Sequence, residues 1–272
     1  AAVDAAWPRG HMVDPVCHEV ARQVDWEGLA RAFARRALRE AGWELPAEGE
    51  ELSLARIAEQ NGRLVDLIRN EVSGLIEHRI WADHRLSHEF RIAMIRLCQG
   101  LVDPGLSPVP PEAIRRWVRG ELLRISEVKP APLFQKVARH NARHLLTSLP
   151  YWLHLCGCGG LFLVLDIERC LLVRSGRRDP QDASRYYTAA TCRDAYEALR
   201  ELVDATDDLE HAFVTVLAPP EFLDPDHRRS VWRYNALKLR IWDEVRDEQR
   251  ANPLGALVRL SRREPSPEEV VA

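Results

Sequence analysis

The run LFLVLD at residues 161–166 constrains the fold of this chain more than any other stretch. Five apolar residues lead directly into Asp166, and Glu168 and Arg169 follow after a single isoleucine. A continuous apolar run of this length is typical of a strand buried on both faces, as in a parallel α/β sheet. Asp166 would then lie at the carboxyl end of the strand, where such sheets bind their ligands.

An acid at this place is the Walker B position of P-loop NTPases, where it helps to hold the Mg²⁺ of the nucleotide. The companion motif GxxxxGK[ST] does not occur in the 272 residues, and Ile167 stands where hydrolysis usually needs a glutamate to orient water. Either the backbone bends to bring Glu168 into the site, or the site binds without efficient hydrolysis. A simpler alternative is that Asp166 caps the next helix.

The composition describes a chain that can bury a core, since 46% of it is hydrophobic and 29% is charged. Its net charge of −3 gives no general support for nucleic-acid binding. No window approaches about 20 apolar residues and no signal peptide is visible, so we expect a cytoplasmic protein without membrane spans. The six irregularly spaced cysteines are expected to be reduced thiols, and Cys156 and Cys158 favour an apolar loop over a zinc site.

Periodicity and breaker residues divide the chain into a mainly helical first half and an α/β second half. We expect helices at 25–42, 54–73 with a continuation over 75–80, 84–99, 111–123, 133–155, 191–205 and 230–250. Strands are expected at 2–6, 161–166 and 212–217, the last also buried, and Pro150 is expected to kink its helix or end it early. The predicted organisation is a helical segment (1–130, which could be an insertion of the same domain), an α/β core with the Walker B strand (131–250) and a polar tail (251–272).

Several other residues could carry chemistry, and each also has a plain structural interpretation. Ala218 and Pro219 follow the strand at 212–217, where many ATPases place a polar sensor, and neither side chain can fill that role. His140 and His144, one helical turn apart, could form a metal pair, although a solvated helix face is the simpler interpretation. Loop arginines could contact phosphate, act as an arginine finger or be solvated charges: Arg169, Arg174, Arg177, Arg178, Arg228 and Arg229.

Five short segments follow one another in an order that is informative as a set. They are 118–122 (VRGEL), 161–169 (LFLVLDIER), 193–204 (RDAYEALRELVD), 213–222 (FVTVLAPPEF) and 234–240 (YNALKLR). Together they resemble the P-loop ATP-binding proteins of the BREX phage-defence systems, the BrxC/BrxD type. The order and spacing agree with that family across residues 114–241.

The resemblance implies an AAA-like P-loop fold, ATP and Mg²⁺ as ligands, and a role in bacterial defence against phage DNA. It makes Asp166 the Walker B acid that holds Mg²⁺ through the nucleotide. It makes Glu168 a catalytic acid, places Arg169 at the nucleotide, and gives Arg240 a phosphate or interface role. The chain departs from the family at Ile167, which replaces an acid, and at residues 218–219, which replace Gly-Thr. Residues 1–7 would correspond to the strand after the P-loop helix, with the P-loop removed, left out of this chain or lost.

Three functional hypotheses follow. The favoured one is a degenerate P-loop ATPase-like protein of a BREX-like defence system, with a nucleotide-dependent or scaffold role. Its partners would be other defence-system proteins or further copies of itself. The second is an active ATPase, of which this chain is a piece without the phosphate loop. The third is a DNA-associated regulatory or interaction module, which the net charge does not support.

Overall fold

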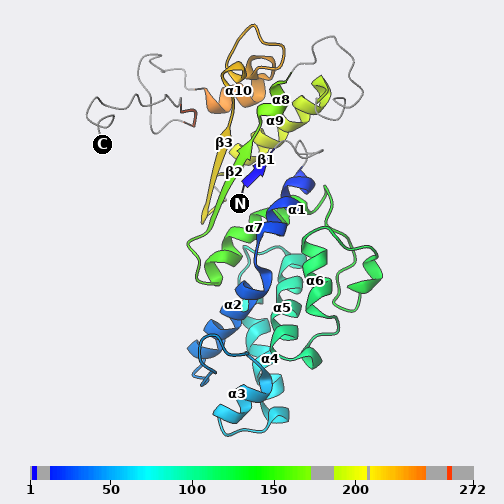
Figure 1. The fold of residues 1–272 in the computed structure, drawn as a ribbon, viewed down its shortest axis with the longest axis vertical. Helices are drawn as coiled ribbons and strands as arrows, with labels where there is room; N and C mark the ends of the chain where they lie inside the picture. Colours follow the sequence, from blue (N-terminus) through cyan, green and yellow to red (C-terminus); the bar gives the residue numbers. More distant parts are fainter. Residues whose placement is uncertain (1, 5–12, 173–186, 207–208, 243–255, 259–272) are drawn as a thin grey trace, which may run out of the picture.

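The computed structural model of the chain describes residues 2–4, 13–172, 187–206, 209–242 and 256–258, and shows a helical bundle joined to a small parallel sheet (Figure 1). The helical part of the chain consists of α1 (Val13–Gln23), α2 (Trp26–Glu40), α3 (Leu54–Gln60), α4 (Val65–Trp81), α5 (His88–Val102), α6 (Pro111–Val118) and α7 (Ala142–Leu155). The second half contains β2 (Leu161–Asp166), α8 (Glu168–Leu171), α9 (Ala189–Asp204), β3 (Ala212–Leu217) and α10 (Asn235–Ile241). The short strand β1 (Ala2–Asp4) comes from the start of the chain, and 3₁₀ turns lie at Pro104–Leu106, Ile125–Glu127, Pro220–Phe222 and Val231–Arg233.

Helix α5 lies at the centre of the bundle and packs against α2, α4, α6 and α7. It is apolar nearly all round, so ten of its fifteen residues are buried, as expected for a helix surrounded by others. Helix α2 shows how the outer helices form. Asp25 caps it by accepting a hydrogen bond from the Gly28 N–H at 3.0 Å, and Trp26, Ala30 and Phe33 share one buried face.

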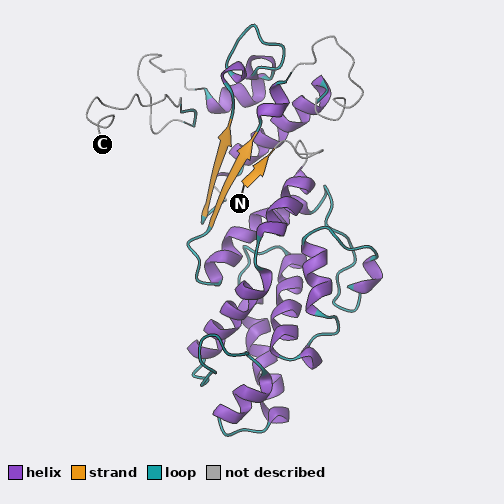
Figure 2. Ribbon diagram, in the orientation of Figure 1, coloured by secondary structure: helices purple, strands orange, loops and turns teal. Residues whose placement is uncertain are grey.

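The sheet is parallel, with strand order β1-β2-β3, and this confirms the predicted α/β class. Its register aligns Asp4 with Asp166 and Asp166 with Leu217, so all three strands end at the same edge. Helices α1, α7 and α9 approach the face of β2 that carries Leu163 and Leu165, which are 1% and 6% exposed. Figure 2 shows the sheet between the bundle and the helices of the second half.

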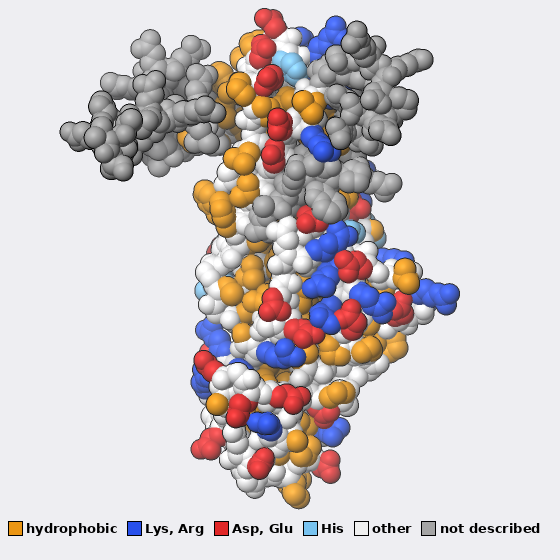
Figure 3. Space-filling view, viewed as in Figure 1, with side chains coloured by type: hydrophobic (Ala, Val, Ile, Leu, Met, Phe, Trp, Pro, Cys, Tyr) orange, Lys and Arg blue, Asp and Glu red, His pale blue; other side chains and the backbone are white. Residues whose placement is uncertain are grey.

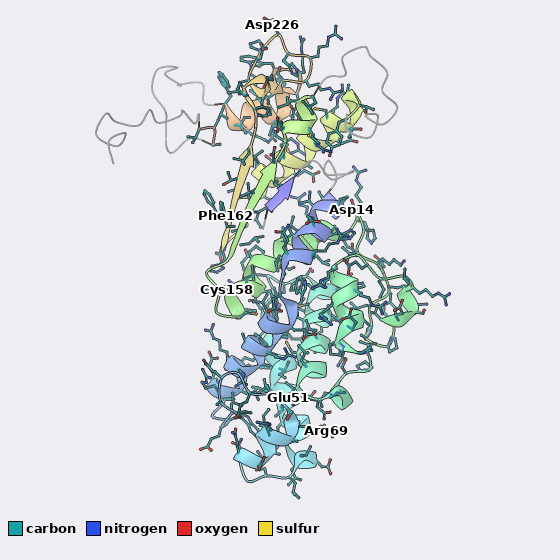
Figure 4. All side chains as sticks on the ribbon, viewed as in Figure 1. Asp14, Glu51, Arg69, Cys158, Phe162 and Asp226 are labelled. Carbon is teal, nitrogen blue, oxygen red and sulfur yellow. The ribbon has the colours of Figure 1, made fainter. Side chains whose placement is uncertain are left out.

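The prediction that β2 and β3 are buried on both faces was wrong. Phe162 is 55% exposed, and on β3 Phe213 and Leu217 are 66% and 43% exposed. Because α1, α7 and α9 all lie on one side, no described helix covers the other face, and Phe162 projects away from α1 (Figure 4). The rings of Phe162 and Phe213 lie 5.5 Å apart between centroids, so each partly shelters the other from water.

Several predicted helix bounds were also wrong, and the causes are local. The helix predicted over 54–73 divides into α3 and α4, because the chain turns through Gly62 in the left-handed region. The helix predicted from 84 to 99 begins at His88 and continues past Gly100, whose bare Cα lets the Pro111 ring approach closely. The helix predicted over 111–123 ends at Val118, and Gly120 at φ +69° turns the chain against the His18 ring.

The long helix predicted over 133–155 begins only at Ala142. Residues 133–141 form turns, in which the Asn141 side chain accepts a hydrogen bond from the Ala138 N–H at 2.8 Å. Pro150 does not end this helix, which continues to Leu155 with the proline buried inside it. In the region predicted as a helix over 230–250, a 3₁₀ turn precedes α10, and residues 243–250 lie outside the described residues.

Helix α1 was not predicted, although its signal is present in the sequence. Val16, Cys17 and Val20 are buried at helical spacing, and the helix packs against α7. The predicted helices at 25–42 and 191–205 and the strands at 161–166 and 212–217 are confirmed within a residue or two. The strand predicted over 2–6 is confirmed over Ala2–Asp4, and residues 5 and 6 lie outside the described residues.

Candidate functional site

Asp166 lies half-buried at the carboxyl end of β2, the central strand of the sheet. One of its carboxylate oxygens, Oδ1, accepts a hydrogen bond from the backbone N–H of Glu168 at 2.9 Å. The next residue extends the ladder, since the Ile167 N–H donates to the carbonyl of Leu217 at 3.0 Å. The aspartate therefore shapes the turn from β2 into α8, which is one role that the sequence had indicated for it.

A small cavity lies beneath this turn. Its volume is about 50 Å³ and its walls come from α1, α7, β2, α8 and α9, including Val16, Leu146, Leu165 and Leu199. Asp166 lines it among predominantly apolar neighbours. Small-molecule sites usually enclose roughly 300–1,000 Å³, so this cavity cannot hold a nucleotide.

A second, larger hollow opens beside the first and shares Val13, Arg143 and Glu201 with it. Its volume is about 340 Å³, within the range of ligand sites. Basic groups on and just before α7 face acidic groups on α9: Arg139, His140, Arg143 and His144 against Asp194, Glu197 and Glu201. Arg143 bridges the two sides through an ion pair with Glu201 at 3.4 Å.

The residues that follow Asp166 differ in their exposure to solvent, since Ile167 is buried and Glu168 is exposed. Ile167 is 5% exposed and lines the small cavity, so a hydrocarbon side chain fills the place where a hydrolytic acid would lie. Glu168 is exposed at the first position of α8, and Arg169 follows it on the same helix. The backbone does not bend to return Glu168 to the strand, because the Asp166 carboxylate holds the Glu168 N–H in the turn.

Arg240 lies on α10 and is engaged with α9. Its Nε donates to Asp204, and its Nη1 donates to the carbonyl of Ala236 at 2.7 Å. The hydrogen bond from Arg240 holds the pKa of Asp204 below its ordinary value, with the positive charge of Arg200 adding to the effect. No contact between Arg240 and Asp166 occurs in the described part of the chain.

Comparison with known proteins settles the family. Residues 68–271 match the family described as BREX system ATP-binding protein BrxC/D. The chain belongs to this family. The match extends the region of resemblance on both sides and contains Asp166, Glu168, Arg169 and Arg240. No curated protein matches the chain. No solved structure matches it either.

The described helices of this BrxC/D-family chain include none that is long and apolar enough to cross a membrane. They also contain no cluster of three or more metal-ligating side chains. His140 precedes α7 rather than lying on it, and its Nε2 is 2.6 Å from the Gln135 Oε1, so the two predicted histidines do not form a helical pair. All six cysteines are unbridged; Cys156 is buried, and Cys158 is exposed in the loop between α7 and β2 (Figure 4).

Arg229 has a structural role in the BrxC/D-family chain that the sequence did not reveal. Its guanidinium donates to the backbone carbonyls of Cys170 and Leu172 at one end and Tyr187 at the other. Its own carbonyl accepts a hydrogen bond from the Tyr196 hydroxyl at 2.6 Å. The arginine thus joins the end of α8 to the approach to α9, and its donors are engaged with protein carbonyls rather than with a phosphate.

The groups around Arg229 are inert at neutral pH. Burial raises the pKa of the Cys170 thiol to about 12, and the neighbouring Cys192 adds to this effect. Burial likewise raises the pKa values of Cys192 and of the Tyr196 hydroxyl. These groups therefore stay protonated, and their role is packing rather than nucleophilic chemistry.

We expect Arg229→Gln to lower the free energy of unfolding by about 2 kcal/mol, because it leaves partly buried carbonyls without their charged donor. Arg228→Gln is the matched control, since that neighbour is exposed, and its effect should stay within about 0.5 kcal/mol. Urea denaturation of the two variants and the wild type measures both. Equal midpoints for all three proteins would contradict the role assigned to Arg229.

Proposed function

We propose that this chain is a nucleotide-responsive component of BREX phage defence, in which Asp166 supplies the Walker B carboxylate of an ATP–Mg²⁺ site. The match to an ATP-binding family supports the nucleotide. The position of Asp166 supports its part in the site, because carboxyl ends of parallel strands are where α/β sheets bind ligands. On this proposal the parallel sheet is part of an AAA-like P-loop core.

The described residues fit only half of such a site. Asp166 offers a carboxylate of the kind that Mg²⁺ accepts, and one of its two oxygens is engaged by the Glu168 N–H. The phosphate cradle has no counterpart, since GxxxxGK[ST] is absent from the sequence and the cavity at Asp166 holds about 50 Å³. The proposed site is therefore a composite one, in which another polypeptide supplies the phosphate-binding loop and this chain supplies Asp166.

The geometry of β3 supports this arrangement. Among the described strands β3 lies at one edge of the sheet, and its exposed Phe213 and Val216 lie on opposite faces. An apolar hollow of about 340 Å³ lies beside it, between α9 and α10. A parallel strand added at this edge would end beside Leu217, two strand spacings or roughly 10 Å from β2, so a phosphate loop following that strand would have to extend across the end of β3 to reach Asp166.

Inefficient hydrolysis is the second part of the proposal, and the burial of Ile167 is the observation that carries it. A hydrocarbon side chain, 5% exposed, cannot orient water or accept its proton. Ala218 and Pro219, directly after β3, bring no polar side chain to the same edge. The chain would thus bind ATP as a structural or signalling ligand. The roles predicted for Glu168, Arg169 and Arg240, and the domain boundary at residue 130, stay predictions.

Calorimetry with ATP–Mg²⁺ tests the proposal, on the chain alone and on the chain assembled with its BREX partners. We expect binding by the assembly that Asp166→Ala abolishes and that the exposed control Asp66→Ala leaves unchanged. We expect turnover at least about 100-fold slower than the ordinary range of about 1–10³ s⁻¹.

The other hypotheses predict different results. Ordinary turnover that Asp166→Ala removes would establish an active ATPase and overturn the assignment of Ile167 as a block to hydrolysis. Binding that survives Asp166→Ala would remove Asp166 from the site. An assembly that binds no ATP at all would leave a scaffold as the function.

A further inference from the structure

One segment of the chain has a charge opposite to that of the whole. Residues 115–143 contain eight basic residues and two acidic ones, although the chain carries a net charge of −3. The basic residues are Arg115, Arg116, Arg119, Arg124, Lys129, Lys136, Arg139 and Arg143, against Glu121 and Glu127. A single average charge therefore hides a concentrated basic region.

Seven of these eight basic residues fall into two groups, and the half-buried Arg119 belongs to neither. Arg115, Arg116 and Arg143 form ion pairs with carboxylates on α2, α6, α9 and the turn at Ile125–Glu127. A second group is exposed, and in the described part of the chain no ion pair joins its members to a carboxylate: Arg124, Lys129, Lys136 and Arg139. The backbone N–H and the charge of Arg124 help to lower the pKa of Glu127, and the guanidinium itself stays exposed. This second group can offer its charge to a ligand.

The second group lies on the turns between α6 and α7, which we call the basic lobe (residues 119–140), and hydrogen bonds join these turns to one another and to α6. The Lys136 Nζ donates to the carbonyl of Leu123 at 2.7 Å and so joins the two turns of the lobe. The Trp117 indole N–H donates to the carbonyl of Gln135 at 2.8 Å and fixes the lobe to α6. Figure 3 shows Lys and Arg side chains, with Asp and Glu side chains among them, over the flank occupied by α6 and the loops after it.

Two large apolar side chains are exposed on the same lobe. Leu123 is 79% exposed and Phe134 is 68% exposed, and the Lys136 contact brings their turns together. An exposed aromatic ring among unpaired cations is the combination that binds single-stranded nucleic acid, because cations attract the phosphates and the ring stacks on a base.

We propose that the basic lobe is a binding surface for single-stranded nucleic acid. Arg124, Lys129, Lys136 and Arg139 contact backbone phosphates, and Phe134 stacks on one base. The surface continues toward the candidate nucleotide site, since Arg139 also lines the basic side of the hollow that Arg143 shares with the cavity at Asp166. The proposal does not depend on that site, because it needs neither ATP nor Asp166.

Fluorescence anisotropy with a labelled oligo(dT) tests the proposal on the full chain across a range of salt concentrations. Four phosphate contacts predict that log K falls against log salt with a slope of about −3. The triple variant Arg124→Ser, Lys129→Ser, Arg139→Ser should reduce this slope to about −1 and the affinity at least about tenfold. The matched control removes the same charge from exposed arginines elsewhere, with Arg31→Ser, Arg39→Ser and Arg56→Ser, and should leave both quantities unchanged.

Phe134 gives the second, independent measurement. Phe134→Ala should weaken oligo(dT) binding about tenfold and Phe134→Trp should preserve it, because stacking needs an aromatic face. The same alanine change should not alter binding to a duplex, whose bases are already stacked.

Three results of these titrations would overturn the proposal: no salt-dependent binding by the wild type, an equal loss of affinity in the two triple variants, or unchanged oligo(dT) binding in Phe134→Ala. Displacement of oligo(dT) by polyglutamate at equal charge concentration would also overturn it, since any polyanion would then suffice. Equal melting temperatures of all variants establish that the changes act on binding rather than on folding.

Discussion

Trp152→Ala should lower the free energy of unfolding by about 3–5 kcal/mol, which is the usual cost of removing a large core aromatic side chain. Trp152 is fully buried on α7. Its ring lies 5.0 Å from that of Phe33 on α2 and 6.4 Å from that of Phe90 on α5, measured between centroids. One side chain thus connects α7, which supports the sheet, to two helices of the bundle, and its loss leaves a cavity where three helices meet.

Two further substitutions make this prediction specific. Trp152→Phe should cost far less, about 1 kcal/mol, because it keeps an aromatic ring and removes a buried indole N–H that has no partner among the described residues. Leu239→Ala should have almost no effect, since Leu239 is 62% exposed. Urea titration followed by circular dichroism measures all three. A small loss for Trp152→Ala would mean that the bundle can collapse around the missing ring.

Gly160→Ala should cost about 2–4 kcal/mol, from backbone strain and from a clash at the start of the sheet. Gly160 has φ +137°, and a Cβ there would overlap the backbone carbonyl of His211. That carbonyl accepts the Leu161 N–H at 2.8 Å, where β2 begins to pair with the chain leading into β3. An alanine must therefore move one strand relative to the other.

The neighbouring Gly159 provides the control in the same loop. Its φ is not in the left-handed region, and an added Cβ would meet nothing within 4 Å. Gly159→Ala should change the melting temperature little or raise it slightly, because alanine reduces the entropy of the unfolded chain. If both alanine variants melt together with the wild type, the close approach of β2 to His211 does not control the stability of the sheet.

The sequence predicted the three strands and the helices α2 and α9 because the residue pattern that indicates each of them is local. The run before Asp166 is too short for most helices and too apolar for a loop, and it is a strand. Its exposure was not predictable in the same way, since burial of Phe162 depends on which side of the sheet the helices cover. The continuation of α5 past Gly100 and of α7 past Pro150 was likewise not predictable, because glycine and proline end many helices and these two residues lie inside theirs.

The candidate site was predictable only in part for the same reason. The place of Asp166 at a strand end followed from one short run of residues. The hollow beside it is formed by α7 and α9, which lie some fifty residues apart in the sequence. The sequence alone therefore did not show that their charged residues face one another. The basic lobe was hidden by the negative net charge, although counting charges in windows would have revealed it.

The contacts of Arg229 have a consequence for the evolution of chain length in this family. The carbonyls of Leu172 and Tyr187 meet at one guanidinium, so the two ends of the intervening stretch are fixed beside each other. A change in the number of residues between Leu172 and Tyr187 would leave these two ends in place, provided that the arginine that holds them is kept.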